Sequence, residues 1–381
     1  MQLLSIWEKE SFFSDQHVII IGSGFAGLWS AMHLKLLHPA HKITILERGI
    51  IPTGASTRNA GFSCFGSPSE LLGDAELMGE EKMWELLSMR YAGLCEIRNY
   101  FSDAEIDYEA SGGFECFKEA SPMWNACHEK LKWLNDGLEK VTGIPDVFKI
   151  ADEKLAHFGF KGFEHLVENK LEGGLHPGKL VQALLRKIQS LGVQVFTGME
   201  ATSYEEINNR VQVHTNHGII FKTNQLLICT NAFAGKLLPG IDIVPNRGQV
   251  LITNPIAGLL LKGTFHFDKG YYYFRNLGNR LLIGGARNMA FDEENTDSMH
   301  TSSTIQQALE SFIKDHLLPN TEFTISDRWS GIMAMGTEKY PIVKGVTNNV
   351  FCCVRMNGIG VALAPIVAKQ VAQLMNNQPT T

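Results

Sequence analysis

Gly22-Ser23-Gly24-Phe25-Ala26-Gly27 follows the apolar run from His17 to Ile21, and a second apolar run, Ile43 to Leu46, ends in Glu47, twenty residues beyond Gly27. In a strand–turn–helix unit with this spacing, the first glycine permits a tight turn, the second admits a pyrophosphate, and the third lets helix and strand pack closely. Amide groups at the helix N-terminus hold the anion, and Glu47 is placed to accept hydrogen bonds from a ribose hydroxyl. The pattern therefore predicts a dinucleotide at the start of the chain, either NAD or FAD.

The composition of the chain is that of an ordinary globular protein. Its 381 residues are 44% hydrophobic and 19% charged, and the formal net charge of −6 gives no electrostatic reason to expect nucleic acid or an anionic membrane as partner. No apolar run approaches the roughly eighteen residues of a membrane span, and no signal-peptide pattern precedes the first strand. The seven cysteines are scattered without a C-x-x-C pair, which favours reduced thiols over disulfides or a zinc site. We therefore expect a cytoplasmic protein without a metal ion.

Helix and strand patterns recur at the start, in the middle and at the end of the chain. Residues 25–37 form one helix pattern, and another opens at His176-Pro177 and ends at Gly192. A long helix pattern at 80–101 and several antiparallel strands at 244–287 interrupt this arrangement. The order predicts a discontinuous α/β protein of two domains, with its ligand at the carboxyl ends of the parallel strands.

Four further segments follow in a specific order. They are Gly54-Ala55-Ser56-Thr57-Arg58-Asn59-Ala60-Gly61-Phe62, Arg247-Gly248-Gln249, Tyr271–Arg275 followed by Arg280–Gly285, and Asn357–Pro365. With the glycine turn, they make the chain resemble the D-amino-acid-oxidase-like FAD-dependent oxidoreductases, which include glycine and sarcosine oxidases, D-amino-acid dehydrogenases and γ-glutamylputrescine oxidases. The resemblance covers nearly the whole chain and implies FAD rather than NAD.

The resemblance also implies an architecture, α/β (α+β), with a Rossmann-like FAD-binding domain and a discontinuous antiparallel-sheet substrate domain. On the interruption pattern, the FAD-binding domain takes residues 1–75, 162–240 and 329–381. The substrate domain takes residues 76–161 and 241–328.

Cofactor contacts follow from the same resemblance. The loop around Ser56–Phe62 is expected to wrap the pyrophosphate and the flavin, and the last helix, with Pro365 in its first turn, aims its N-terminus at the pyrimidine edge of the flavin. Because relatives that attach flavin covalently use residues that this chain lacks, we expect non-covalent FAD. The predicted cofactor-binding residues are Gly22, Gly24, Phe25, Ala26, Gly27, Glu47, Arg48, Ala55, Ser56, Thr57, Arg58, Asn59, Ala60, Gly61, Phe62, Ala201, Thr230, Asn231, Ala232, Gly331, Ile332, Gly358, Ile359, Gly360, Val361 and Ala362.

The substrate side is expected on the strand from Tyr271 to Arg275. Strand alternation places Tyr271, Tyr273 and Arg275 on one face, where aromatic rings can cage an amine and Arg275 can pair with a carboxylate. For any single residue, ordinary packing in an amphipathic strand is the alternative interpretation. Glycine-oxidase-like members place a carboxylate-binding arginine just after the Gly-Ile step of a late strand, where this chain has Met333, and Arg355 is the candidate replacement. The predicted catalytic residues are Tyr271, Tyr273, Arg275 and Arg355.

The predicted function is the FAD-dependent oxidation of a C–N bond in a small amine or amino-acid derivative, in which a hydride passes from carbon to flavin and the resulting imine hydrolyses. One alternative keeps the flavin and oxidises a 2-hydroxy acid. Another is a flavin-binding assembly protein without turnover. Oxidase and dehydrogenase both remain open, and so does an electron-acceptor partner.

Overall fold

The computed structural model describes residues 4–119 and 121–377 and divides into two compact units. Unit 1 comprises Met1–Thr57, Gly178–Pro245 and Met333–Thr381, and unit 2 comprises Arg58–Pro177 and Asn246–Ile332. Both units are thus assembled from separate stretches of chain. The domain boundaries predicted after residues 75, 161, 240 and 328 stay a prediction.

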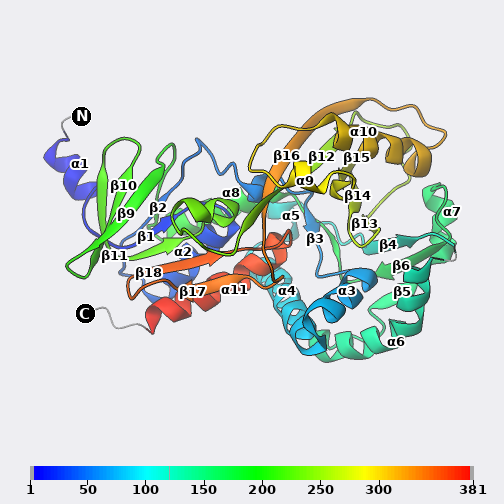
Figure 1. The fold of residues 1–381 in the computed structure, drawn as a ribbon, viewed down its shortest axis with the longest axis horizontal. Helices are drawn as coiled ribbons and strands as arrows, with labels where there is room; N and C mark the ends of the chain where they lie inside the picture. The colour runs from blue at the N-terminus through cyan, green and yellow to red at the C-terminus, as the bar shows by residue number, and fades with distance from the viewer. Residues whose placement is uncertain (1–3, 120, 378–381) are drawn as a thin grey trace. The chain divides into compact units, whose positions relative to one another are not determined.

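Unit 1 is built on an eight-stranded sheet with a parallel centre. Its elements are α1 (Ile6–Ser11), β1 (Gln16–Ile21), α2 (Phe25–Leu37), β2 (Ile43–Leu46), α8 (Pro177–Ser190), β8 (Gln194–Phe196), β9 (Ala201–Ile207), β10 (Arg210–Thr215), β11 (Ile220–Ile228), β17 (Ile342–Gly345), β18 (Val350–Val354) and α11 (Gly360–Asn376). Strands β18, β11, β1, β2 and β8 lie side by side and run parallel. Helices α2 and α11 pack against each other (Figure 1). The helix predicted at 25–37 is confirmed, and the strand predicted up to Glu47 is observed as β2, which ends at Leu46 with Glu47 directly after it.

Two details of unit 1 bear on the site, and the second differs from the sequence expectation. One strand, β11, serves both parts of the sheet, since it pairs with β10 over its first residues and with β1 over the rest. Pro365 lies inside α11 and not in its first turn. Because proline has no N–H, the carbonyl four residues earlier loses its helical donor. The Pro365 carbonyl oxygen itself lies 3.1 Å from Nε2 of His33 on α2.

Unit 2 is built on a second eight-stranded sheet. Its elements are β3 (Phe62–Ser63), α3 (Pro68–Met78), α4 (Glu80–Tyr100), α5 (Asp103–Ile106), β4 (Gly113–Phe117), α6 (Pro122–Thr142), β5 (Phe148–Ile150), α7 (Leu155–Phe158), β6 (His165–Asn169), β7 (Gly173–Gly174), β12 (Val244–Thr253), β13 (Thr264–Phe267), β14 (Tyr272–Leu277), β15 (Arg280–Gly285), α9 (Phe291–Glu294), α10 (Ser303–Phe312) and β16 (Ile325–Met335). The strand order is β16-β12-β15-β14-β13-β4-β6-β5, and β3 pairs with β7 in a small separate sheet. The antiparallel strands predicted at 244–287 are confirmed, although β13 also pairs in parallel with β4.

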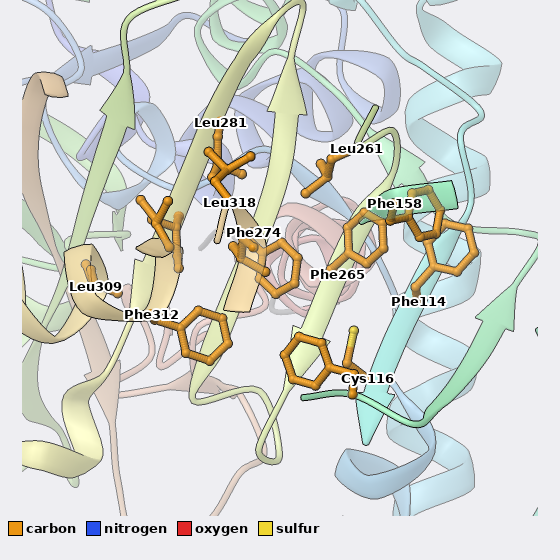
Figure 2. Packing of buried hydrophobic residues seen from close by; sticks show 14 of the residues in the cluster. Phe114, Cys116, Phe158, Leu261, Phe265, Phe274, Leu281, Leu309, Phe312 and Leu318 are labelled. Atoms are coloured by element: carbon orange, nitrogen blue, oxygen red, sulfur yellow. The ribbon is translucent and has the colours of Figure 1, made fainter. Parts of the chain in front are cut away.

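The two faces of the unit 2 sheet differ in chemistry. One face carries a dense aromatic cluster, in which the rings of Phe265 and Phe274 stack with centroids 5.1 Å apart and Phe312 of α10 packs beside them (Figure 2). The other face carries polar groups, because His266 pairs in register with Tyr273 on one side and with Glu115 on the other. None of the helices in the described part of the chain has the length and hydropathy that a membrane crossing requires.

The aromatic cluster should dominate the stability of unit 2. We expect Phe274→Ala to lower the free energy of unfolding by about 3–5 kcal/mol, because this fully buried ring leaves a cavity when it is removed. Urea denaturation followed by tryptophan fluorescence measures the loss. Leu260, which is 52% exposed, provides the control, since Leu260→Ala should change stability by no more than about 0.5 kcal/mol. Equal effects of the two substitutions would contradict this account of the core.

Candidate functional site

The turn between β1 and α2 leaves no space for side chains at two of its glycines. Gly22 has φ of +103°, and a Cβ there would lie 2.9 Å from the carbonyl oxygen of Cys229, just beyond β11. A Cβ on Gly27 would lie 2.0 Å from the carbonyl oxygen of Gly22. Both obstacles are backbone atoms, so neither can move without displacing a strand or a helix. Close packing therefore requires glycine at both positions, as the dinucleotide motif predicts.

The N-terminus of α2 offers amide donors that its own cap does not satisfy. Gly24 is the N-cap residue and makes no side-chain cap hydrogen bond. The hydroxyl oxygen of Ser56 accepts a hydrogen bond from the Phe25 N–H at 2.8 Å and lies 3.0 Å from the position of a Cβ on Gly24. A polar acceptor thus already stands where the partial positive charge of the helix favours an anion. Ala26 follows in the same first turn.

Glu47 is a buried and oriented acceptor at the end of β2. Its Oε2 accepts hydrogen bonds from the N–H and the hydroxyl of Ser23, at 3.0 and 2.6 Å, and its Oε1 accepts from the Gly49 N–H at 2.8 Å. An ionised carboxylate accepts about four hydrogen bonds, so these three leave capacity for a further donor. This geometry is compatible with the predicted ribose contact.

Thr230 provides a test of whether a cofactor fits. It follows β11 beside the glycine turn, and its hydroxyl oxygen is buried without a hydrogen-bond partner among the described residues. A buried hydroxyl without a partner is costly, and a ligand oxygen next to the turn would satisfy it. Together with the start of α2, which no side chain of its N-cap residue caps, the orphaned hydroxyl fits a dinucleotide at this edge of the sheet.

Other predicted cofactor residues of unit 1 have roles within the protein. The Asn231 side-chain oxygen accepts hydrogen bonds from the N–H groups of Arg355 and Met356, at 3.1 and 3.3 Å, and so joins the ends of β11 and β18. The Arg48 guanidinium carbon lies 3.9 Å from the ring centre of Phe233. Ala201 begins β9, Ala232 is buried after β11, and Ala55 and Thr57 belong to the 3-10 turn that contains Ser56.

The N-terminus of α11 follows a left-handed backbone. Asn357 and Gly358 have φ of +47° and +81°, and a Cβ on Gly358 would touch Sδ of Met333 at 3.4 Å. The helix then begins at Gly360. The predicted residues Ile359, Val361 and Ala362 flank this start, so their backbone amides belong to the first turn, where a helix favours negative charge.

Arg355 is already neutralised. Its Nη1 forms an ion pair with the Asp242 carboxylate, and its Nε donates to the Tyr340 carbonyl oxygen at 2.8 Å. The Arg355 side chain is 7% exposed. This pairing argues against the predicted role of Arg355 as the cation for a substrate, because a ligand carboxylate would have to displace Asp242.

The loop predicted to wrap the cofactor continues into unit 2, where it is held by late strands. Arg58 Nη1 donates to the Ser330 carbonyl oxygen at 2.9 Å, and a Cβ on Gly331 would lie 3.1 Å from Cβ of Arg58. The Asn59 side chain accepts from the Gly61 N–H at 2.9 Å. Ala60 packs beside Val250, Ile252 and Leu282, and Ile332 is buried.

Arg275 supports that loop. Its Nη1 donates to the carbonyl oxygens of Gly61 and Leu175, at 2.5 and 2.9 Å, and its Nε donates to the Asn276 carbonyl oxygen at 2.9 Å. The side chain is 3% exposed. Arg275 is on the predicted face of β14, but these bonds argue for a positioning role and against the predicted contact with a substrate carboxylate.

The polar face of the unit 2 sheet centres on Tyr273 and His266. The ring of Phe62 meets both edge-on, with centroid distances of 6.0 Å to Tyr273 and 5.2 Å to His266. Gly284 makes room for Tyr273, since a Cβ there would lie 2.4 Å from the tyrosine ring. Burial raises the pKa of Tyr273 to about 12, so its hydroxyl stays protonated. Burial lowers the pKa of His266, which is therefore neutral at neutral pH.

Two buried carboxyls lie near this face. Glu115 of β4 accepts hydrogen bonds from the N–H and hydroxyl of Ser69, and Glu172 accepts from the Phe65 N–H at 2.8 Å. They are 1% and 2% exposed. Burial raises the pKa of each to about 8, so both are mainly protonated at neutral pH. Glu115 thus holds the first turn of α3, and Glu172 holds the loop amides of Phe65 and Gly66, without introducing a full buried charge.

Sequence reasoning missed two residues near the predicted tyrosines, His266 and Arg287. The Nε2 atom of His266 is buried without a hydrogen-bond partner in the described part of the chain, and its Nδ1 lies 3.6 Å from Oε2 of Glu70. Arg287 begins a 3-10 turn after β15. Of these two residues, only Arg287 could have been found from the sequence, because it closely follows the glycine pair Gly284-Gly285. Among the residues described, no group of His, Cys, Asp or Glu side chains is arranged to hold a metal ion.

Comparisons with known proteins match nearly the whole chain. A family model described as FAD dependent oxidoreductase matches residues 17–374. Glycine oxidase of Geobacillus kaustophilus is 23% identical over 384 residues, covering 95% of this chain and 93% of the relative. L-2-hydroxyglutarate dehydrogenase of Indibacter alkaliphilus is 26% identical over 249 residues, covering 62% of this chain and 57% of the relative.

Other matches are longer than this chain or show only the fold. The bifunctional protein ThiO/ThiG of a Synechocystis strain is 25% identical over 370 residues, which cover 95% of this chain and 52% of the relative. The chain thus spans about half the length of such bifunctional relatives. Among solved structures, L-proline dehydrogenase from P. horikoshii superposes with a TM-score of 0.74 at 18% identity, covering 96% of both chains. That likeness shows the fold, as the sequence predicted it.

Binding of the cofactor should depend on Gly27. We expect Gly27→Ala to reduce the bound FAD per protein at least about tenfold, because the new methyl group would collide with the Gly22 carbonyl oxygen and push the helix away from the turn. The absorbance of the purified protein at flavin wavelengths measures the occupancy. Gly73→Ala is the matched control. Gly73 lies in α3, where a Cβ would meet no atom within 4 Å, so this variant should keep its full FAD content. Full occupancy in Gly27→Ala as well would refute the packing argument.

The buried carboxyls predict a pH dependence of stability. The folded pKa of Glu172, about 8, exceeds its ordinary value of 4.5. Its contribution to the free energy of unfolding is therefore fully present below about pH 4.5 and is lost as the pH rises through about 8. Glu172→Gln keeps an acceptor oxygen for the Phe65 N–H and cannot ionise. Its melting temperature should therefore fall less than that of the parent between about pH 5 and 8.5, by a few degrees, since about 1 kcal/mol corresponds to about 2–4 °C.

Calorimetric scans at several pH values measure this difference. The exposed Glu129→Gln serves as control and should follow the parent at every pH. Parallel pH profiles for the parent and Glu172→Gln would show that Glu172 ionises equally in the folded and unfolded chain.

Proposed function

The chain belongs to the family of FAD-dependent oxidoreductases, and on that premise we propose that it oxidises the C–N bond of a small amine or amino-acid derivative. The observation that carries the proposal is the fit of the glycine turn and the orphaned Thr230 hydroxyl to a dinucleotide. The amine assignment is supported by the similarity to glycine oxidase, which extends over 93% of that relative.

Within this proposal, unit 1 is the FAD-binding domain and unit 2 the substrate domain. Bound FAD supplies the acceptor for the hydride that leaves the carbon bearing the amine. Glu47 would orient the ribose, and the amides at the start of α2 and the Thr230 hydroxyl would hold the diphosphate. The seven unpaired cysteines support the proposed cytoplasmic location, where thiols stay reduced.

We assign the proton chemistry of the substrate to His266. An alkylammonium group cannot release a hydride from its α-carbon until the nitrogen loses a proton and its lone pair becomes available. His266 is neutral at neutral pH, and its Nε2 has no partner in the described residues, so it can accept that proton. Tyr273, beside it in the sheet, keeps its proton and can donate a hydrogen bond to the substrate. The imine then hydrolyses to a carbonyl compound and ammonia or an amine.

A second candidate function is the oxidation of a 2-hydroxy acid. The similarity to L-2-hydroxyglutarate dehydrogenase favours it, although that match covers 62% of this chain. The same neutral imidazole would then accept the hydroxyl proton. The two candidates differ in the donor atom attached to the carbon that is oxidised.

Anaerobic titration of the FAD-loaded protein distinguishes these candidates. We expect amines or amino acids from a panel to bleach the flavin absorbance, and the matched 2-hydroxy acids to leave it unchanged. Bleaching by hydroxy acids alone would reverse the assignment, and no bleaching by any donor would favour a protein without turnover. Readmission of air then separates an oxidase, which recolours quickly, from a dehydrogenase. Acid precipitation should release the flavin into the supernatant, because we expect non-covalent binding.

A further inference from the structure

The imidazole of His266 on β13 meets different surroundings at its two nitrogens. Its Nδ1 lies 3.6 Å from Oε2 of Glu70 on α3, whereas its Nε2 is buried without a hydrogen-bond partner among the described residues. In a neutral imidazole one nitrogen carries the proton and the other a lone pair, and a carboxylate beside one nitrogen favours the proton there. The proton of neutral His266 therefore belongs on Nδ1, and the lone pair on Nε2.

Glu70 is held in place by backbone groups on two sides. It is the third residue of α3, and its Oε2 accepts a hydrogen bond at 3.1 Å from the N–H of Ser67, the N-cap residue of that helix. Its Oε1 lies against the turn between β13 and β14, where a Cβ on Gly270 would stand 2.7 Å away. Gly270 also has φ of +78°, so glycine meets both requirements of the turn. The carboxylate thus has little freedom to move away from His266.

A helix cap alone does not account for this placement. In a capping box, a glutamate side chain accepts a hydrogen bond from the N-cap residue three positions earlier. Two other capping boxes occur in the described part of the chain, at α1 and α5, and their glutamates are Glu8 and Glu105. Both lie at the surface, whereas Glu70 is partly buried and faces the imidazole of His266. Capping requires no histidine, so this contact is an additional feature of the box at α3.

Glu70 is the ionised carboxyl beside His266. Burial opposes its ionisation, but the imidazole, hydrogen bonds from the N-cap residue and the guanidinium of Arg90 together hold its pKa below the ordinary value. Glu115, the in-register neighbour of His266 on β4, is mainly protonated, and Tyr273, its neighbour on β14, keeps its proton. Among the described residues, Glu70 is therefore the charge that acts on the imidazole, and it lies on the Nδ1 side.

We propose that Glu70 is the positioning residue of His266: it keeps the imidazole proton on Nδ1 and stabilises the imidazolium that forms when Nε2 takes the proton of the substrate. This inference rests on the proposed function. In that step the N–H bond of the substrate ammonium breaks, its electron pair stays on the substrate nitrogen, and a new N–H bond forms at Nε2. Glu70 keeps its negative charge throughout, so the positive charge that moves to the ring meets a counter-charge.

Nuclear magnetic resonance of the FAD-loaded protein with isotope-labelled histidine tests the pair without turnover. The signal of His266 is the one that His266→Asn removes. We expect neutral His266 of the parent to carry its proton on Nδ1, and a proton on Nε2 would overturn the inference. This measurement needs no change at Glu70, so it decides the inference even if variants of Glu70 do not fold.

The same spectra, recorded over a pH series, measure the effect of the charge. We expect Glu70→Gln to lower the pKa of His266, because the amide keeps an acceptor for the Ser67 N–H but removes the negative charge. Glu70→Asp keeps the charge and should restore part of the difference. Glu105→Gln, in the capping box of α5, is the matched control and should leave the pKa of His266 unchanged. Equal pKa values in the parent and Glu70→Gln would refute the role of Glu70.

Anaerobic flavin reduction connects the pair to the chemistry. In Glu70→Gln the rate constant for flavin reduction should fall about tenfold, because a weaker base takes the proton, and the acidic limb of its pH profile should move to lower pH. The dissociation constant of the donor and the FAD content should change little. An unchanged rate constant despite a lowered pKa of His266 would overturn the inference. A parent that no donor bleaches would instead refute the proposed function, and the resonance spectra would still decide whether Glu70 controls the protonation of His266.

Discussion

The close approach of three backbone segments at the end of β1 is the constraint on which unit 1 depends. The Cys229 carbonyl borders Gly22, and the Gly22 carbonyl lies where a side chain at residue 27 would stand. Since the parallel strands all end at the same edge, the turn, Glu47 and Thr230 lie together there. A dinucleotide is held mainly by backbone amides. It can therefore bind only where those amides can come close to its pyrophosphate, as they can at a glycine turn.

Unit 2 meets a different constraint, because one sheet must bury both of its faces. The aromatic face is stabilised by contact area alone. The polar groups on the other face are buried with hydrogen-bond partners: Glu115 holds the start of α3, Glu172 holds two loop amides, and Arg275 donates to three carbonyl oxygens. Groups of this kind are costly to bury without hydrogen bonds, and satisfied ones make the arrangement rigid. His266 and Arg287 stand out against this background: among the described residues, Nε2 of His266 has no hydrogen-bond partner and no carboxylate forms an ion pair with Arg287.

The arginines show that the partners of a buried charge cannot be predicted from the sequence. Alternation along β14 correctly separates Tyr273 from Phe274, which lies in the aromatic core. Alternation also places Arg275 on the polar face, but it cannot reveal that the carbonyls of Gly61 and Leu175, distant in sequence, take up its hydrogen bonds. Proximity to Gly358 suggested Arg355 as a substrate cation, whereas Asp242, more than a hundred residues earlier, neutralises it. Arg287 was overlooked because nothing in its local sequence shows the absence of an acidic neighbour.

The sequence by itself determined the glycine turn, α2, the strand ending at Glu47 and the membership of a two-unit α/β fold. Each of these depends on local geometry: glycine conformations, the helical repeat and the two-residue repeat of a strand. The extent of β11, the interior position of Pro365 and the partner of every buried charge were decided only by the tertiary structure. A side chain's chemistry depends on what lies within a few ångströms of it, and in this fold those atoms come from chain segments that are far apart in sequence.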